Sequence, residues 1–190
     1  MGRNKVLYDK QQIIDIAVSI VVEEGIEVLS ARRIASELGV SSMTMYNYVS
    51  NIDEVKRELM IRGYNELFRN IIQKLSLKEK KDRSGVAAFI KIYAEQFYEY
   101  GEKHRNLMKF MLGEGYTKFY ADAELRLFVN PLQSYYKYSK ERDYQLACRI
   151  CEDMMYSELK KYINGINPLS KDEFLYQVEY CVDRVFDLGR

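Results

Sequence analysis

The sequence has few residues that interrupt helices. Only two of its 190 residues are proline, Pro131 and Pro168, and its ten glycines fall mostly between segments of apolar periodicity. Such a chain forms long helices easily, whereas a multi-stranded sheet is disfavoured. We therefore expect an all-α protein of about nine helices.

Residues for catalysis are scarce as well. The chain contains one histidine, His104, and it lacks a G-x-S-x-G motif, a phosphate-binding loop and paired carboxylates in an apolar setting. An enzyme needs a converging set of such groups. We therefore expect neither an enzyme nor a cofactor, and we interpret His104 as a helix-start or surface residue.

The cysteines are odd in number, and no secretory signal accompanies them. Cys148 and Cys151 lie inside an apolar-periodic segment, with Cys181 on a later one. This usage indicates reduced thiols rather than a disulfide framework. Because the Cys148-x-x-Cys151 pair is not at a strand-to-helix turn, we favour buried structural thiols and expect no metal site. A three-thiolate sensor that includes Cys181 is the alternative.

Long apolar runs are absent too. No segment approaches the length of a membrane span, and the N-terminus lacks the apolar stretch of a signal peptide. We therefore expect a cytoplasmic protein with no membrane partner.

An excess of charge is also missing, since the formal net charge is only +1. The chain as a whole therefore gives no electrostatic argument for a nucleic-acid partner. Basic residues do occur near the N-terminus, but carboxylates accompany them: Arg3, Lys5, Lys10, Arg32 and Arg33 stand beside Asp9, Glu27 and Glu37.

The most informative segment that is present runs from residue 25 to residue 49. Ser30 suits a helix N-cap, and an apolar stripe follows it at helical spacing. Gly39 then fits the left-handed position after a helix, and Ser41 suits the cap of a second one. The segment predicts two short helices joined by a tight turn, a pattern that an ordinary helical hairpin shares.

On the second helix Met45 and Val49 lie one turn apart, so they can face the core with Val40. The polar and aromatic positions between them are left outside: Ser42, Met43, Thr44, Tyr46, Asn47 and Tyr48. A helix ending at Gly25 precedes this pair, and a long helix over residues 52–75 follows it. This arrangement favours a helix-turn-helix.

At these positions the chain resembles the TetR family of bacterial transcription regulators. The resemblance covers roughly the first quarter to third of the chain and runs through Ile14, Ala17, Ile20, Glu23, Gly25, Ser30, Ile34, Ala35, Gly39, Val40, Ser41, Thr44, Tyr46 and Tyr48. It implies a helix-turn-helix DNA-binding domain over residues 1–55 and a helical effector-binding and dimerisation domain over residues 56–190. It also implies a repressor that binds a palindromic double-stranded DNA operator as a homodimer and is released by a small apolar or aromatic effector.

The resemblance assigns roles within the helix-turn-helix. Base edges are expected to meet Ser42, Met43, Thr44 and Asn47, and backbone phosphates to meet Ser30, Arg32, Tyr46 and Tyr48, with core packing as the alternative for Tyr48. Ser41 is also expected to bind DNA. Two positions where the family commonly has lysine hold Ser42 and Ile52 here. We therefore expect weak phosphate contact, with Arg3 and Lys5 compensating.

Apolar spacing predicts further helices over residues 84–100, 103–112, 117–130, 131–139, 142–164 and 170–188, and Ser170 with Glu173 makes a capping box. The last two helices suit a four-helix dimer bundle. Its expected contacts are Ile150, Met154, Phe174, Val178, Cys181, Val182 and Val185, although these side chains can instead pack within one subunit.

Aromatic and methionine side chains suit an adaptable effector pocket. The candidates are Tyr93, Phe97, Tyr100, Met108, Met111, Tyr116, Phe119, Tyr120 and Met155, for which plain core packing is the alternative. Glu95 and Glu99 would make such a pocket cation-selective unless they are solvated surface charges. A regulator-like protein that binds a protein partner instead of DNA remains the alternative function.

Overall fold

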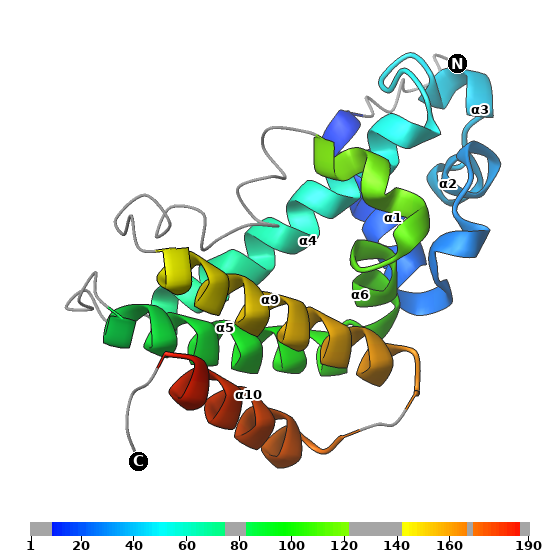
Figure 1. The fold of residues 1–190 in the computed structure, drawn as a ribbon. Helices are drawn as coiled ribbons and strands as arrows, with labels where there is room; N and C mark the ends of the chain where they lie inside the picture. The colour runs from blue at the N-terminus through cyan, green and yellow to red at the C-terminus, as the bar shows by residue number, and fades with distance from the viewer. Residues whose placement is uncertain (1–8, 75–82, 122–141, 167–168, 187–190) are drawn as a thin grey trace, which may run out of the picture.

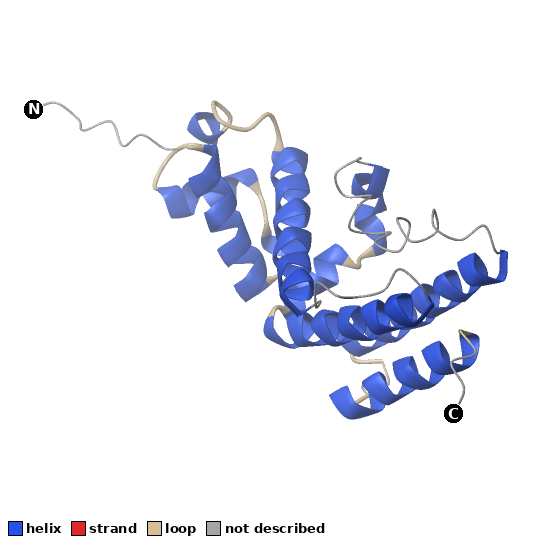
Figure 2. Cartoon of the chain, turned by 90° about the vertical axis from the view of Figure 1, so that its left-hand side faces the viewer, coloured by secondary structure: helices blue, strands red, loops and turns tan. Residues whose placement is uncertain are grey.

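The computed structural model describes residues 9–74, 83–121, 142–166 and 169–186, and every regular element in these ranges is helical (Figures 1 and 2). The elements are α1 (Lys10–Glu24), the 3-10 helix η1 (Ile26–Val28), α2 (Ala31–Leu38), α3 (Ser42–Met45), α4 (Ile52–Lys74), α5 (Arg83–Lys103), α6 (Arg105–Met111), the 3-10 helix η2 (Glu114–Ala121), α9 (Arg142–Ile163) and α10 (Lys171–Val185). The prediction of an all-α protein is confirmed.

The helices form two groups joined by α4. Helices α1, α2 and α3 contact one another at one end of the molecule, and α1 also packs along α4 (Figure 1). At the other end α5, α9 and α10 pack against each other in pairs. We call the first group the N-terminal unit, and α5, α6, η2, α9 and α10 the helical body.

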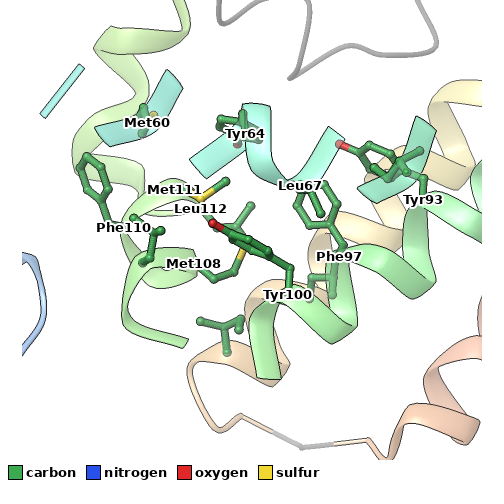
Figure 3. Packing of buried hydrophobic residues seen from close by; sticks show 14 of the residues in the cluster. Met60, Tyr64, Leu67, Tyr93, Phe97, Tyr100, Met108, Phe110, Met111 and Leu112 are labelled. Carbon is green, nitrogen blue, oxygen red and sulfur yellow. The ribbon is translucent and has the colours of Figure 1, made fainter. Parts of the chain in front are cut away.

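The core runs through both groups without a break. Ile13 and Ile34 are buried in the N-terminal unit, while Tyr93 and Phe174 are buried in the helical body. Helix α4 connects these regions through a row of buried residues that includes Tyr64 (Figure 3). Because the core is continuous, a movement of helices in one group changes the packing of side chains in the other.

Helix α6 ties the helical body to the N-terminal unit. It packs on both α1 and α4, and the Asn106 side-chain nitrogen donates to the carbonyl oxygens of Val22 and Glu23 at 3.1 and 3.4 Å. Backbone carbonyls at the end of a helix lack partners within that helix. The end of α1 is therefore completed by a residue more than 80 positions away in sequence.

Helix caps explain several boundaries. Asp9 and Gln12 form a capping box at α1, and Ser170 and Glu173 form the predicted one at α10. The predicted helices over residues 84–100 and 103–112 meet at His104, the N-cap position of α6, so His104 is the expected helix-start residue. Its ring is mostly buried beside Tyr100, with the centroids 4.8 Å apart, so it is not a surface residue.

The structure differs from the predicted elements in two places. It contains a 3-10 helix after Gly25, η1, that was not predicted. The segment predicted as a helix over residues 117–130 is a 3-10 helix up to Ala121, and the rest of it, like the predicted helix over residues 131–139, lies outside the described residues. In the described ranges, none of the helices is both long and apolar enough to cross a membrane.

Candidate nucleic-acid interface

The turn between α2 and α3 is built as the sequence predicts. Ser30 caps α2, with its Oγ accepting from the Arg33 amide at 3.1 Å. Gly39 ends the helix in the left-handed conformation, with φ at 68°, and the Val40 amide donates to the Ala35 carbonyl at 2.9 Å. This is the hydrogen-bond pattern of a helix that stops at a glycine.

Helix α3 is short, and its start is fixed by side chains. Ser41 Oγ accepts from the Thr44 amide at 3.1 Å and lies 2.9 Å from Thr44 Oγ1. The helix ends at Met45, and hydrogen-bonded turns continue the chain to Tyr48. Met45 and Val49 are buried as predicted, so both ends of the α3 segment are held against the core.

The outward face of this segment presents a mixed apolar and polar surface. Met43 is 81% exposed and Tyr46 is 46% exposed. Of the other predicted DNA-binding residues, Ser30, Arg32, Ser41 and Asn47 are exposed, while Ser42, Thr44 and Tyr48 are half-buried. Tyr48 packs against the core, so its ring contributes to folding as well as to the surface. We call Ser41, Ser42, Met43, Thr44, Tyr46 and Asn47 the recognition surface.

Two basic residues expected near this surface are bound within the protein. Arg33 pairs with Glu24 at 2.7 Å and also with Glu37, one turn along α2. Lys10 lies 2.8 Å from carboxylate oxygens of both Glu54 and Glu58 on α4. Exposed ion pairs contribute little to stability, but each places negative charge beside the cation. Carboxylates of the protein itself therefore offset the positive charge of both cations.

The start of α4 is capped by neighbouring residues in the chain. The Glu54 amide donates to Asn51 Oδ1 at 2.9 Å, and Glu54 Oε2 accepts from the Ser50 amide at 2.6 Å. The Lys10 ammonium and the Ser50 amide together lower the pKa of Glu54 to about 2. Glu54 thus stays ionised and links α1 to α4.

One contact at this end was not predicted. Lys118 of η2 lies 2.6 Å from Asp53 Oδ2 in the first turn of α4, and Lys56 Nζ lies 5.6 Å from the centroid of the Tyr116 ring. No periodic signal in the sequence joins positions 65 residues apart, which is why this pair could not be foreseen.

The predicted effector residues fall into separate environments. Tyr93 and Phe97 pack together with Tyr156, with ring centroids 4.6 to 6.4 Å apart, and the Tyr93 and Tyr156 hydroxyls are 2.6 Å from each other. Tyr100, Met108 and Met111 gather below α4 (Figure 3). Met155 is also buried.

Tyr116 and Phe119 belong to a different region. The Tyr116 ring lies 4.5 Å from the ring of Phe110, close to the start of α4, and Phe119 is buried. The Tyr120 side chain lies outside the described residues. The predicted effector residues that the structure describes are therefore spread along one continuous core.

Two carboxylates considered for that pocket are surface charges. Glu95 and Glu99 both lie within 3.4 Å of Lys74 at the end of α4 and of Lys171 at the start of α10. Glu152 on α9 is a buried carboxylate of the helical body. It follows Cys151 in the sequence, and no local sequence pattern predicts that it is buried. Burial and the neighbouring Tyr156 hydroxyl raise the pKa of the Tyr93 hydroxyl well above its ordinary value, and the Glu152 charge adds to them.

Two of the three cysteines, Cys148 and Cys151, are buried thiols of low reactivity. Burial, with the Glu152 charge, raises the pKa of Cys148 to about 12. Burial and the neighbouring Cys181 raise the pKa of Cys151 further. Among the described residues no group of three or more His, Cys, Asp or Glu side chains is arranged to hold a metal ion. The geometry favours structural thiols over a thiolate sensor.

The predicted dimer contacts divide by burial. Phe174, Val178 and Val182 are buried within the protomer, where α10 packs on α5 and α9, so their assignment to a dimer surface is corrected. Met154, Cys181 and Val185 are half-buried, and only Ile150 of the set is exposed. Three further apolar or aromatic residues on the same two helices are exposed, namely Leu146, Tyr176 and Tyr180.

Comparison with known proteins identifies the fold. No protein-family model matches the chain. Among curated proteins, an uncharacterised HTH-type transcriptional regulator, YobS of Bacillus subtilis, is 24% identical over 86 residues, which is 45% of this chain and 44% of that protein. The match thus spans less than half the length of that relative.

Solved structures match over nearly the whole chain. A TetR-like transcriptional regulator from Rhodococcus sp. RHA1 superposes with a TM-score of 0.67 at 16% identity, covering 94% of this chain and 96% of the other. A TetR variant from Acinetobacter baumannii in complex with minocycline has a TM-score of 0.61 at 16% identity, covering 96% and 98%. The chain therefore has the fold of TetR-family transcriptional regulators.

Proposed function

We propose that this protein is a transcription regulator that binds a palindromic DNA operator as a homodimer, represses by doing so, and is released by a small apolar or aromatic effector. The recognition surface is the part that enters the major groove. The observation that carries the proposal is this surface itself, which is exposed at Met43 and Tyr46 while buried Met45 and Val49 hold its backbone in place.

The chemistry of the surface suits direct base contact. Asn47 is exposed, and its amide can both donate to and accept from an adenine edge. Met43 offers an apolar contact to a thymine methyl group. Ser30, Arg32 and Tyr46 are exposed, and we propose that they bind backbone phosphates, which fix the orientation of the protein on the duplex.

A homodimer supplies the second recognition surface. A palindromic site needs two such surfaces about 34 to 36 Å apart, one turn of DNA. The exposed aromatic pair on α10, Tyr176 and Tyr180, and the exposed Leu146 and Ile150 on α9 are the side chains available for a two-fold contact. An apolar effector would contact aromatic side chains of the helical body such as those around Tyr93.

The test is a random-sequence DNA selection with the purified full-length protein, combined with sedimentation analysis. We expect a dimer that enriches a palindrome with half-sites one helical turn apart. A double Thr44→Ala/Tyr46→Ala variant should lose the selected site by at least tenfold in affinity, as expected when base and phosphate contacts are removed. Ile72→Ala, at an exposed position on the far part of α4, is the matched control and should bind as the parent does.

A protein partner in place of DNA is the second candidate function. It is favoured by the apolar exposure of Met43 and by the carboxylates that pair with Arg33 and Lys10. An intact dimer that enriches no palindrome would favour this alternative over DNA binding.

A further inference from the structure

The first turn of α4 adjoins the recognition surface, so its charge matters for any phosphate nearby. Only residues 46–51 separate α3 from α4, and the two helices lie at the same end of the molecule (Figure 1). The turn carries two carboxylates, Asp53 and Glu54. Left uncompensated, both would repel a phosphate.

The two carboxylates are compensated from different directions. Glu54 is held by Lys10 and by the Ser50 amide, both from the N-terminal unit and its connection to α4. Asp53 is held by Lys118, which belongs to the helical body. The Lys118 hydrogen bond lowers the pKa of Asp53, so this partner stabilises the ionised carboxylate.

A second lysine stands beside the same carboxylate. Lys56 follows Asp53 by three positions, one turn along α4, and its charge also favours the ionised form of Asp53. Tyr116 of η2 lies under the Lys56 ammonium, and the Lys118 ammonium lies 5.1 Å from the centroid of the Phe119 ring. Two ammonium groups, one from α4 and one from η2, thus act on the Asp53 carboxylate.

We propose that Lys118 is a DNA-contacting residue supplied by the helical body, which with Lys56 forms a phosphate-binding pair beside the recognition surface and offsets the repulsion from Asp53. The inference rests on the proposed function and names a further site for the same ligand. Positions 42 and 52 hold Ser42 and Ile52 instead of lysine. Lys118 and Lys56 supply positive charge close to Ile52.

The contact between η2 and α4 would couple the helical body to DNA binding. Lys118 reaches α4 only while η2 packs against that helix. A shift of η2 would therefore move the Lys118 ammonium away from the phosphate and leave the Asp53 carboxylate without its ion-pair partner. A change in the helical body then weakens phosphate contact directly, as well as through any change in the spacing of the two recognition surfaces.

The test compares Lys118→Ala with Asp53→Asn, because the two substitutions break the same ion pair. If the pair only braced η2 against α4, both would change DNA affinity in the same direction. As a phosphate site, Lys118→Ala should lower affinity roughly tenfold, and Asp53→Asn should raise it. Lys160→Ala, an exposed lysine on α9, is the matched control for the lost charge.

Affinity is measured by fluorescence anisotropy as a function of salt, with a duplex carrying the selected palindrome and with a mixed-sequence duplex of equal length. Lys118→Ala should weaken both duplexes by the same factor and reduce the salt slope by about 0.9 for each lysine removed. Lys118→Gln, which keeps a hydrogen-bonding side chain, should show the same reduced slope, and unchanged melting temperatures exclude a folding effect.

The inference is overturned if Lys118→Ala and Lys160→Ala give equal affinities and slopes, or if Asp53→Asn weakens binding as Lys118→Ala does. Failure of the wild-type protein to bind any duplex would instead refute the proposed function. The two failures are therefore distinguishable.

Discussion

Gly63 of α4 faces Met111 of α6 at so short a distance that a Cβ atom on the glycine would come within 2.6 Å of the methionine sulfur. Met111 is fully buried, so its side chain has little room to withdraw. The absence of a side chain at position 63 is what allows α6 to lie this close to α4.

Gly63→Ala should therefore destabilise the protein by about 1 to 3 kcal/mol, the usual cost of overpacking a core. Urea denaturation measures the change. Gly115→Ala is the control, because a Cβ there meets no atom within 4 Å. Adding Met111→Ala to Gly63→Ala should make the second substitution less costly than in the wild type, and strict additivity would contradict the proposed contact.

Gly39→Ala tests the turn of the helix-turn-helix. Its φ of 68° is in the left-handed region, and a Cβ atom added at this position would meet no atom within 4 Å, so the penalty is one of backbone conformation alone. We expect a loss of about 1 to 2 kcal/mol in unfolding free energy. Gly39→Asn should lose less, because asparagine tolerates this conformation better. Equal losses for alanine and asparagine would argue against a left-handed turn.

Glu54 should make stability depend on pH. Its pKa is lowered from 4.5 to about 2 in the folded protein. The stabilisation is therefore fully present above about pH 4.5 and is lost as the pH falls toward 2. Glu54→Gln should cost about 1 kcal/mol at pH 7, typical of a lost cap and a partly exposed ion pair. Thermal melts should show the difference from wild type shrinking below about pH 4.5.

The control for this pH effect is Glu102→Gln, a substitution at an exposed position near the end of α5. It should leave the pH dependence of the melting temperature unchanged. A Glu54→Gln difference that stays constant down to about pH 2.5 would contradict the lowered pKa.

Cysteine labelling tests the assignment of inert thiols. Because burial raises the pKa values of Cys148 and Cys151, their thiolate fractions at about pH 8 are small. A thiol reagent should modify these two residues far more slowly in the native protein than in denaturant, as followed by mass spectrometry. Rapid modification of both in the native state would revive the sensor hypothesis.

Local sequence signals predict local structure well. The caps at Ser30, Ser41 and Ser170 and the turn at Gly39 each depend on a few neighbouring residues, and each is present. The burial of Met45 and Val49 agrees with their spacing in the sequence, although α3 ends at Met45 and hydrogen-bonded turns continue the chain beyond it. Such features need no knowledge of the rest of the chain.

Features that depend on distant partners are missed or misassigned. An apolar stripe reveals that a face is buried but does not identify what covers it, so the stripe predicts dimer contacts at Phe174 and Val182 although α5 and α9 bury them. Likewise the sequence does not reveal that folding places Glu24 beside Arg33. The Lys118–Asp53 pair has the same origin, in elements that meet only in the folded chain.

The hydrogen bonds from Asn106 to the end of α1 limit how the protein can be divided. A fragment cut after α4 would leave those carbonyl oxygens and the apolar surface under α6 to solvent. Chimaeras that graft this N-terminal unit onto a foreign regulator should accordingly be designed with α6 transferred alongside it. The two parts are separated in the sequence, but α6 supplies the hydrogen bonds that the end of α1 lacks.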